Sequence, residues 1–153
     1  MKTHLSIAFL ILVLGAIAWF LTNSVFITEE ERIYRLIESA RESVEEGSIL
    51  TISNILASDY QDAGGADKAT VTRILFDVFQ KSENRRITVT DIQLETEETQ
   101  ATALIQFTFQ TNYRGSLPFP TGDSRGPEPA AATARVVFGK ENGNWKVKHT
   151  HIY

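Results

Sequence analysis

The sequence predicts an α+β domain that follows a single N-terminal membrane helix. Three observations predict it: an uncharged apolar run near the start, helical periodicity between residues 28 and 81, and alternating periodicity after residue 84. A chain of 153 residues has room for one such domain and a short appendage. We therefore divide it into an anchor with its linker, residues 1–24, and a domain, residues 25–153.

The anchor is predicted from Leu5–Leu21, which contains no charged side chain. As a helix, this run would extend about 26 Å, close to the hydrocarbon thickness of a bilayer. Lys2 precedes it and Glu29 follows it, so the positive-inside rule places the N-terminus in the cytoplasm. We expect a single-pass protein that spans the cytoplasmic (inner) membrane with residues 5–22 and has an extracytoplasmic, periplasmic domain.

Two alternatives to an uncleaved anchor stay open. Ala16–Ala18 fits the small-x-small pattern of a signal-peptidase site, although the run continues apolar through Leu21. The run could also be a helix of a soluble core, although it lacks the polar stripe that such helices carry.

Composition narrows the class of partner. Residues 25–153 hold all 19 acidic residues and 14 of the 15 basic ones, a formal net charge of −5. Because lysine and arginine form no cluster interleaved with aromatics, nucleic acid is not an expected partner. The absence of cysteine excludes a disulfide framework, a thiolate metal site and a lipid anchor on cysteine. We expect no cofactor.

Three helices are predicted after the linker. The first begins at Thr28, which forms a capping box with Glu31, and ends at Gly47. A shorter second helix follows Ser48 and buries apolar residues through Leu56. The stretch SDYQDAGG then interrupts the regular secondary structure. The third runs from about Asp67, its cap, to Lys81.

About four antiparallel strands are predicted after Asn84. They comprise residues 87–94, 101–109, 132–140 and 144–153, and the last two are joined by the Asn142-Gly143 hairpin turn. The alternation slips near Asp91, which indicates a β-bulge. Such a sheet can bury one face against the helices. Tyr113–Pro129 holds all four prolines, and we expect a mobile loop or partner contact there rather than an ordered lid.

Two motifs carry a family resemblance that covers roughly residues 28–153. The first comprises Leu56, Asp59, Tyr60, Asp62 and Gly64 or Gly65, and the second comprises Gly143, Trp145, Lys146, Val147 and His149 or His151. With the order of helices and strands, they resemble the NTF2-like (SnoaL-like, cystatin-like α+β cone) superfamily. The resemblance implies a curved sheet that wraps around three helices, a conical pocket and frequently a dimer through the sheet. It implies no single activity, because the fold hosts isomerases, dehydratases, transport adaptors and secretion-system assembly subunits.

The last strand carries the candidate site. Strict alternation would put Trp145, Val147, His149, His151 and Tyr153 on one face, which we expect to be the interior. One hypothesis makes His149 a general base that Asp62 orients, with Tyr60 donating a hydrogen bond to the substrate. The competing interpretation has both histidines satisfied by the backbone and by Tyr34 or Tyr60, while Asp59 or Asp62 caps a turn.

Further site expectations follow. The candidate ligand-binding residues are Tyr34, Tyr60, Phe107, Trp145, His149 and His151. We expect no metal site, because two histidines at i, i+2 lack a third ligand at a defined spacing.

Two function classes remain. The first, which we favour, is a membrane-tethered, non-catalytic module that binds a partner protein or a small apolar ligand. The second is a small cofactor-independent isomerase, dehydratase or cyclase that uses His149 with Asp62 or Tyr60. A large apolar pocket around His149 would favour the enzyme, whereas an interior filled by side chains would favour the binding module.

Overall fold

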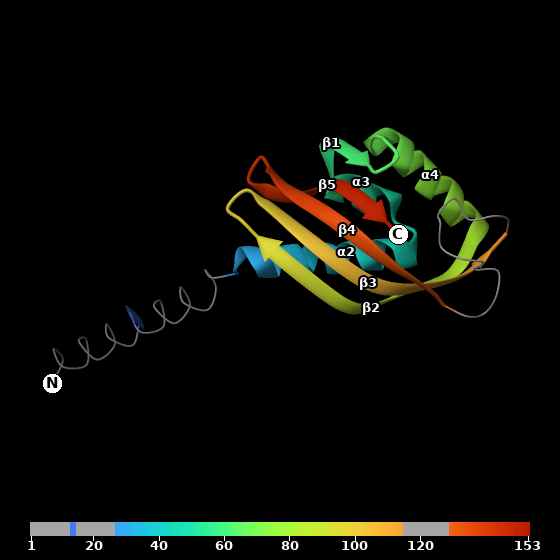
Figure 1. Ribbon diagram of the computed structural model, residues 1–153, viewed down its shortest axis with the longest axis horizontal. Helices are drawn as coiled ribbons and strands as arrows, with labels where there is room; N and C mark the ends of the chain where they lie inside the picture. The colour runs from blue at the N-terminus through green and yellow to red at the C-terminus, as the bar shows by residue number, and fades with distance from the viewer. Residues whose placement is uncertain (1–12, 15–26, 115–128) are drawn as a thin grey trace.

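The computed structural model describes residues 13–14, 27–114 and 129–153. The predicted membrane segment, apart from Val13 and Leu14 in a helical conformation, lies outside these ranges, and so do residues 115–128 of the proline-rich loop. Among the described residues, no helix combines the length and the apolar character that crossing a membrane requires. Residues 27–114 and 129–153 form an α+β unit in which the helices cover one side of a sheet (Figure 1).

The three predicted helices are confirmed as α2 (Glu29–Glu46), α3 (Ile49–Ile55) and α4 (Lys68–Lys81). The hydroxyl of Thr28 accepts the N–H of Glu31 at 3.2 Å and caps α2. Gly47 ends this helix in the left-handed conformation, with φ of 74°. Asp67 caps α4 by accepting the N–H of Thr70 at 2.9 Å.

In the part of the chain that the structure describes, five strands form one mixed sheet in the order β1-β5-β4-β3-β2. They are β1 (Leu56–Asp62), β2 (Ser82–Thr96), β3 (Gln100–Tyr113), β4 (Ala130–Glu141) and β5 (Asn144–Ile152). The four predicted strands are confirmed as antiparallel neighbours. The prediction that the stretch SDYQDAGG after α3 interrupts the regular structure is wrong for its first part. Strand β1 occupies Leu56–Asp62 and pairs in parallel with β5.

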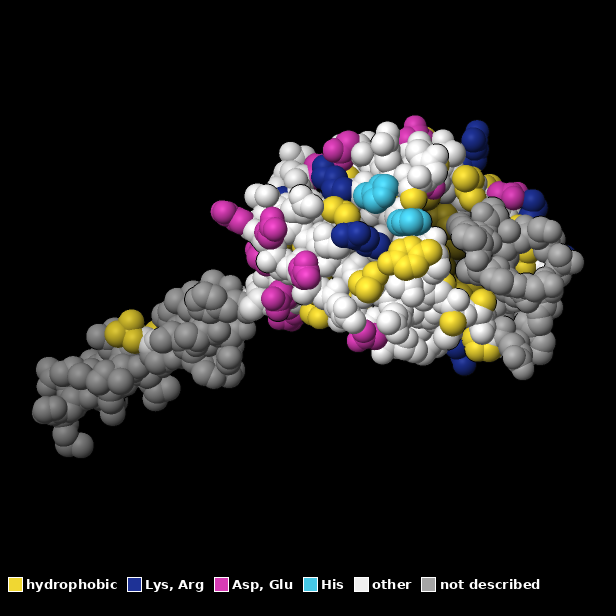
Figure 2. All heavy atoms as spheres, viewed as in Figure 1, with side chains coloured by type: hydrophobic (Ala, Val, Ile, Leu, Met, Phe, Trp, Pro, Cys, Tyr) yellow, Lys and Arg dark blue, Asp and Glu magenta, His cyan; other side chains and the backbone are white. Residues whose placement is uncertain are grey.

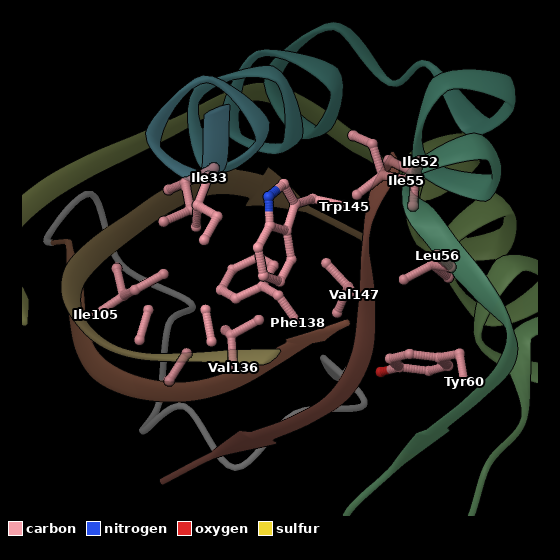
Figure 3. Close-up of a cluster of buried hydrophobic side chains, with 14 residues drawn as sticks. Ile33, Ile52, Ile55, Leu56, Tyr60, Ile105, Val136, Phe138, Trp145 and Val147 are labelled. Carbon is pink, nitrogen blue, oxygen red and sulfur yellow. The ribbon is translucent and has the colours of Figure 1, made fainter. Parts of the chain in front are cut away.

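The core lies between α2 and the concave face of the sheet, which we name the inner face; the opposite face is the outer face. Figure 3 shows the strands curling around this cluster beneath α2, with Trp145, Phe138 and Val136 pointing toward Ile33. Phe138 is 1% exposed and Ile33 is fully buried. Burial of this apolar cluster is the main source of stability, because the chain has no disulfide.

Two of the register shifts in the described sheet bear on the sequence predictions. The register of β2 and β3 shifts between Val89 and Asp91, which confirms the bulge predicted there. A second bulge was not predicted: Phe138 on β4 pairs with Val147, whereas Val137 pairs with His149. The extra residue, Lys148, reverses the side-chain alternation of β5 from that point onward.

Because of this second bulge, the prediction that the alternate residues of β5 share one face is wrong. Trp145 and Val147 lie on the inner face, but beyond Lys148 the inner positions belong to Thr150 and Ile152. His149 and His151 therefore lie on the outer face.

Candidate functional site

Tyr60, the predicted hydrogen-bond donor to a substrate, is buried. It lies on β1, is 3% exposed and shares a hydrogen bond with the hydroxyl of Thr150 on β5. Desolvation by burial raises the pKa of its hydroxyl, and the hydrogen bond with Thr150 opposes that shift. The hydroxyl that was expected to contact a substrate is thus satisfied inside the protein.

Asp62 holds the turn that follows β1. Its side-chain oxygen Oδ1 accepts the N–H of Ala66 at 2.7 Å, and its backbone N–H donates to the carbonyl of Ala66 at 2.9 Å. The N–H of Ala63 donates to the carbonyl of Thr150 at 2.9 Å, which ties this turn to β5. Asp62 thus acts as a turn cap, because its carboxylate satisfies a backbone N–H of its own loop.

The two histidines do not join this cluster. In the ladders, His149 faces Val137 and Gln61, and His151 faces the exposed Arg135. The ring of His151 packs edge-on against Tyr153 with 5.1 Å between centroids. Figure 2 shows the two histidine side chains (cyan) next to each other on the surface. His149 and Asp62 lie on opposite faces of the sheet, so the structure does not form the predicted base and orienting carboxylate.

Trp145 belongs to the core at the other end of the inner face. It is 6% exposed, and its indole N–H donates to the carboxylate of Glu29 at 2.5 Å. Lys140 contacts the same carboxylate at 3.3 Å and lies 5.2 Å from the indole ring centroid. These contacts hold the first turn of α2 against the β4–β5 hairpin.

The remaining candidate ligand-binding residues are separated. Phe107 is partly buried on β3 and packs against the core, whereas Tyr34 is 42% exposed on α2. The six candidates therefore lie in three places: the inner face, the outer face and the solvent side of α2. They do not line one pocket.

A cleft between α3 and α4 was not predicted from the sequence. It has a volume of about 710 Å³, and its walls include Leu50 and Phe76, which are 74% and 53% exposed. Both residues are apolar but fall outside the buried stripes of their helices, and this signal could have indicated the cleft.

Arg85 lines this cleft and binds the carboxyl ends of two helices. Its Nε donates to the carbonyl of Val44 in α2 at 2.8 Å, and its Nη1 donates to the carbonyls of Phe79 and Ser82 at 3.4 and 2.6 Å. The guanidinium also lies 4.9 Å from the centroid of the Phe79 ring. A cation suits this position because both helix dipoles are negative there.

The part of the chain that the structure describes contains no group of three or more His, Asp or Glu side chains arranged to hold a metal ion.

Comparison with known proteins identifies the fold. No family model and no curated protein matches the sequence. Among solved structures, an NTF2-like protein from Cytophaga hutchinsonii superposes with a TM-score of 0.66 at 12% identity, over 82% of this chain and 98% of that one. The chain has the NTF2-like, cystatin-like fold.

Two further solved structures agree with this fold. A protein of the NTF2-like family from Streptomyces avermitilis, proposed to be a dehydratase, has a TM-score of 0.65 at 14% identity and covers 80% of this chain and 92% of its own. A cystatin-like protein of unknown function from Nostoc punctiforme has a TM-score of 0.64 at 15% identity, with 83% and 91% covered. At these identities the likeness extends to the fold alone, because one fold hosts many activities.

Proposed function

We propose that the protein is a non-catalytic NTF2-like binding module tethered to the outer side of the cytoplasmic membrane. Its tether is the apolar run of residues 5–22, and its domain binds a partner protein or a small apolar ligand there. The proposal that the module is non-catalytic rests on the bulge at Lys148, because this bulge puts His149 and Asp62 on opposite faces of the sheet.

The filling of the inner face supports the same proposal. Apolar side chains from α2, α3 and four strands pack into one cluster there (Figure 3), and the hydroxyl of Tyr60 is already bonded to Thr150. A general base needs a position within hydrogen-bond reach of a substrate proton. Both histidines lie on the outer face, so neither can act as a general base on the inner face.

The outer face offers room for a partner. It carries alternating polar side chains of β3 and β4 together with Val137, both histidines and Tyr153, which is 58% exposed. A second copy of the chain on this face is the homodimer that we propose as one mode of assembly. If the homodimer forms, a native mass spectrum of the detergent-solubilised full chain contains a species with twice the mass of one protomer.

Alkaline carbonate extraction of cells that produce the full chain tests the tether. We expect the protein in the membrane pellet, because a span of apolar residues is not released by high pH. The matched control replaces Leu10 and Leu14 with arginine, which lowers the apolar character of the span without touching the domain. Recovery of the unmodified chain in the supernatant would overturn the tether.

The same native mass spectrum tests the binding role. A bound partner protein or one discrete apolar molecule supports it. A molecule that the protein converts to a product, with conversion lost in His149→Ala, would instead establish the enzyme alternative.

A further inference from the structure

Strand β2 forms a free edge of the sheet. It pairs with β3 on one side, and no described segment pairs with its other side. Figure 1 shows β2 along the margin of the domain, with its arrowhead at the end where α2 begins. An edge strand has a row of unpaired N–H and C=O groups that can pair with another extended chain.

The ladder identifies which backbone groups point outward. In an antiparallel pair, facing residues alternate between hydrogen-bonded and non-hydrogen-bonded positions. The N–H of Glu97 donates to the carbonyl of Gln100 at 2.8 Å, so this pair is hydrogen-bonded. Along the unbroken register, Thr96, Leu94 and Ile92 are therefore non-hydrogen-bonded positions. Their N–H and C=O groups point away from β3, toward the open edge.

Only part of this edge is protected. The N–H of Ile87, which has the same outward orientation, donates to the carboxylate of Glu45 on α2 at 2.8 Å. The register shifts beside Arg86 and at Thr90 interrupt the strand further. Bulges, prolines and lysines usually protect a strand edge from pairing. The segment from Asp91 to Thr96 has an unbroken register and contains neither proline nor a basic residue.

The side chains of this segment define its complement. Asp91, Gln93 and Glu95 are exposed on the outer face, whereas Ile92 and Leu94 lean on the core from the inner face. The outer row thus holds two carboxylates and no cation. An added strand would place its own alternate residues beside these two rows, and opposite charges stabilise such cross-strand neighbours.

We propose that the edge from Asp91 to Thr96 binds an extended segment of a partner protein in which lysine or arginine alternates with apolar residues. The added strand pairs with the outward backbone groups, sets its basic side chains against Asp91 and Glu95, and extends the apolar inner face beyond Leu94. This assignment rests on the proposed binding role and names its partner class.

A second copy of the chain is a poorer complement. In an antiparallel self-pairing centred on Gln93, Asp91 would face Glu95 of the other copy, and facing like charges are destabilising. The basic residues Arg85 and Arg86 lie on the far side of the bulge at Thr90 and cannot take these positions in an unbroken register.

Fluorescence anisotropy with a labelled probe tests the proposal on the full chain in phosphatidylcholine nanodiscs, with empty nanodiscs as the blank. The probe is a short synthetic peptide that alternates lysine and valine, and the reference peptide alternates glutamate and valine. We expect the lysine peptide to bind at least about tenfold more tightly than the glutamate peptide.

Two variants of the edge test the geometry. Leu94→Pro removes an outward N–H that β3 does not use, and D91K/E95K reverses the outer charges; each should weaken lysine-peptide binding by about tenfold or more. The matched control is E42K/E46K on α2, which has the same net charge as D91K/E95K and should change binding by less than about twofold. Circular dichroism checks that each variant folds. If Leu94→Pro does not fold, the comparison between D91K/E95K and E42K/E46K tests the proposal by itself.

The outcomes distinguish a failure of the edge-binding proposal from a failure of the membrane-tether proposal. Equal binding of both peptides, or equal loss in D91K/E95K and E42K/E46K, would overturn the proposal. A native mass spectrum in which D91K/E95K disrupts a homodimer would also overturn it, since the edge would then be occupied by a second copy. Failure of peptide binding while the chain stays in the carbonate pellet rejects the edge assignment and leaves the tether intact.

Discussion

The hydroxyl of Tyr60 on β1 hydrogen-bonds to the hydroxyl of Thr150 on β5, within the parallel pair of strands that completes the sheet. Tyr60 is 3% exposed, so its hydroxyl has little access to water. Thr150 reaches it because the extra residue Lys148 turns Thr150, rather than His149, to the inner face. This pair occupies the place where a catalytic pair was expected.

Thr150→Val should lower the free energy of unfolding by about 1–3 kcal/mol, because it leaves the Tyr60 hydroxyl buried without a partner. Adding Tyr60→Phe to that variant should recover most of the loss, since both polar groups are then absent. Urea denaturation of residues 25–153 gives the four values of the double-mutant cycle. Additive effects would show that the two hydroxyls are not coupled.

Alkaline pH should weaken the fold through Tyr60. Burial raises the pKa of its hydroxyl above the ordinary value of 10.0, so the folded state holds this proton more tightly than the unfolded state does. The stabilisation is present below pH 10 and is lost as the pH rises through the raised pKa. Unfolding free energies measured between about pH 9 and pH 11 should fall more steeply for the unmodified domain than for Tyr60→Phe. Parallel curves would contradict this assignment.

Trp145→Ala should destabilise the domain by about 3–5 kcal/mol, because the large ring is buried in the core beneath α2. Thermal and urea unfolding of residues 25–153 measure this loss. Tyr153→Ala is the matched control, since Tyr153 is an aromatic residue that directly follows the same strand and is 58% exposed. A loss under about 1 kcal/mol for Trp145→Ala would be incompatible with a buried ring.

Acid should release the contact between Glu29 and Trp145. The hydrogen bond from the indole lowers the pKa of the Glu29 carboxyl, and Lys140 and Arg32 lower it further. Its contribution to stability is therefore present above the ordinary value of 4.5 and is lost as the pH falls through the lowered pKa. Indole fluorescence in a Trp19→Phe background should change in that range below pH 4.5, and Glu29→Gln should abolish the change. A transition that persists in Glu29→Gln would assign it to another group.

Arg85→Met should cost about 1.5–3 kcal/mol of stability, because carbonyls at the ends of α2 and α4 then lose a charged donor. Arg85→Lys should not restore it, since one ammonium cannot span two helix ends as the guanidinium fork does. The neighbouring Arg86 is exposed, and Arg86→Met should stay within about 0.5 kcal/mol. Equal effects at both positions would argue against the role of Arg85 as a cap.

Local patterns predicted most of the helices and strands correctly. Thr28, Gly47 and Asp67 marked helix ends because capping depends on residues within one turn. The slip of alternation near Asp91 revealed the first bulge, because apolar residues on both sides of it had to keep facing the core.

The parallel strand β1 could not be predicted in this way. Residues Leu56–Asp62 contain several turn-forming side chains and resemble a loop, yet they pair with β5, about ninety positions later in the chain. Pairing with a distant partner supplies backbone hydrogen bonds that local propensity does not anticipate.

The sequence by itself determined the α+β class, the helix caps, the hairpin at Asn142-Gly143 and the apolar face of β3, because each depends on neighbours within a few residues. Only the tertiary structure decided which side of the sheet His149 faces. The bulge at Lys148 leaves no mark in the alternation, since tryptophan, valine, histidine and tyrosine suit either face of a strand end. It is stabilised by contacts with β1 and β4, where Lys148 reaches Asp59 at 2.7 Å and covers the bare backbone of Gly139. That single extra residue separates the predicted catalytic pair and leaves Thr150 to bond Tyr60.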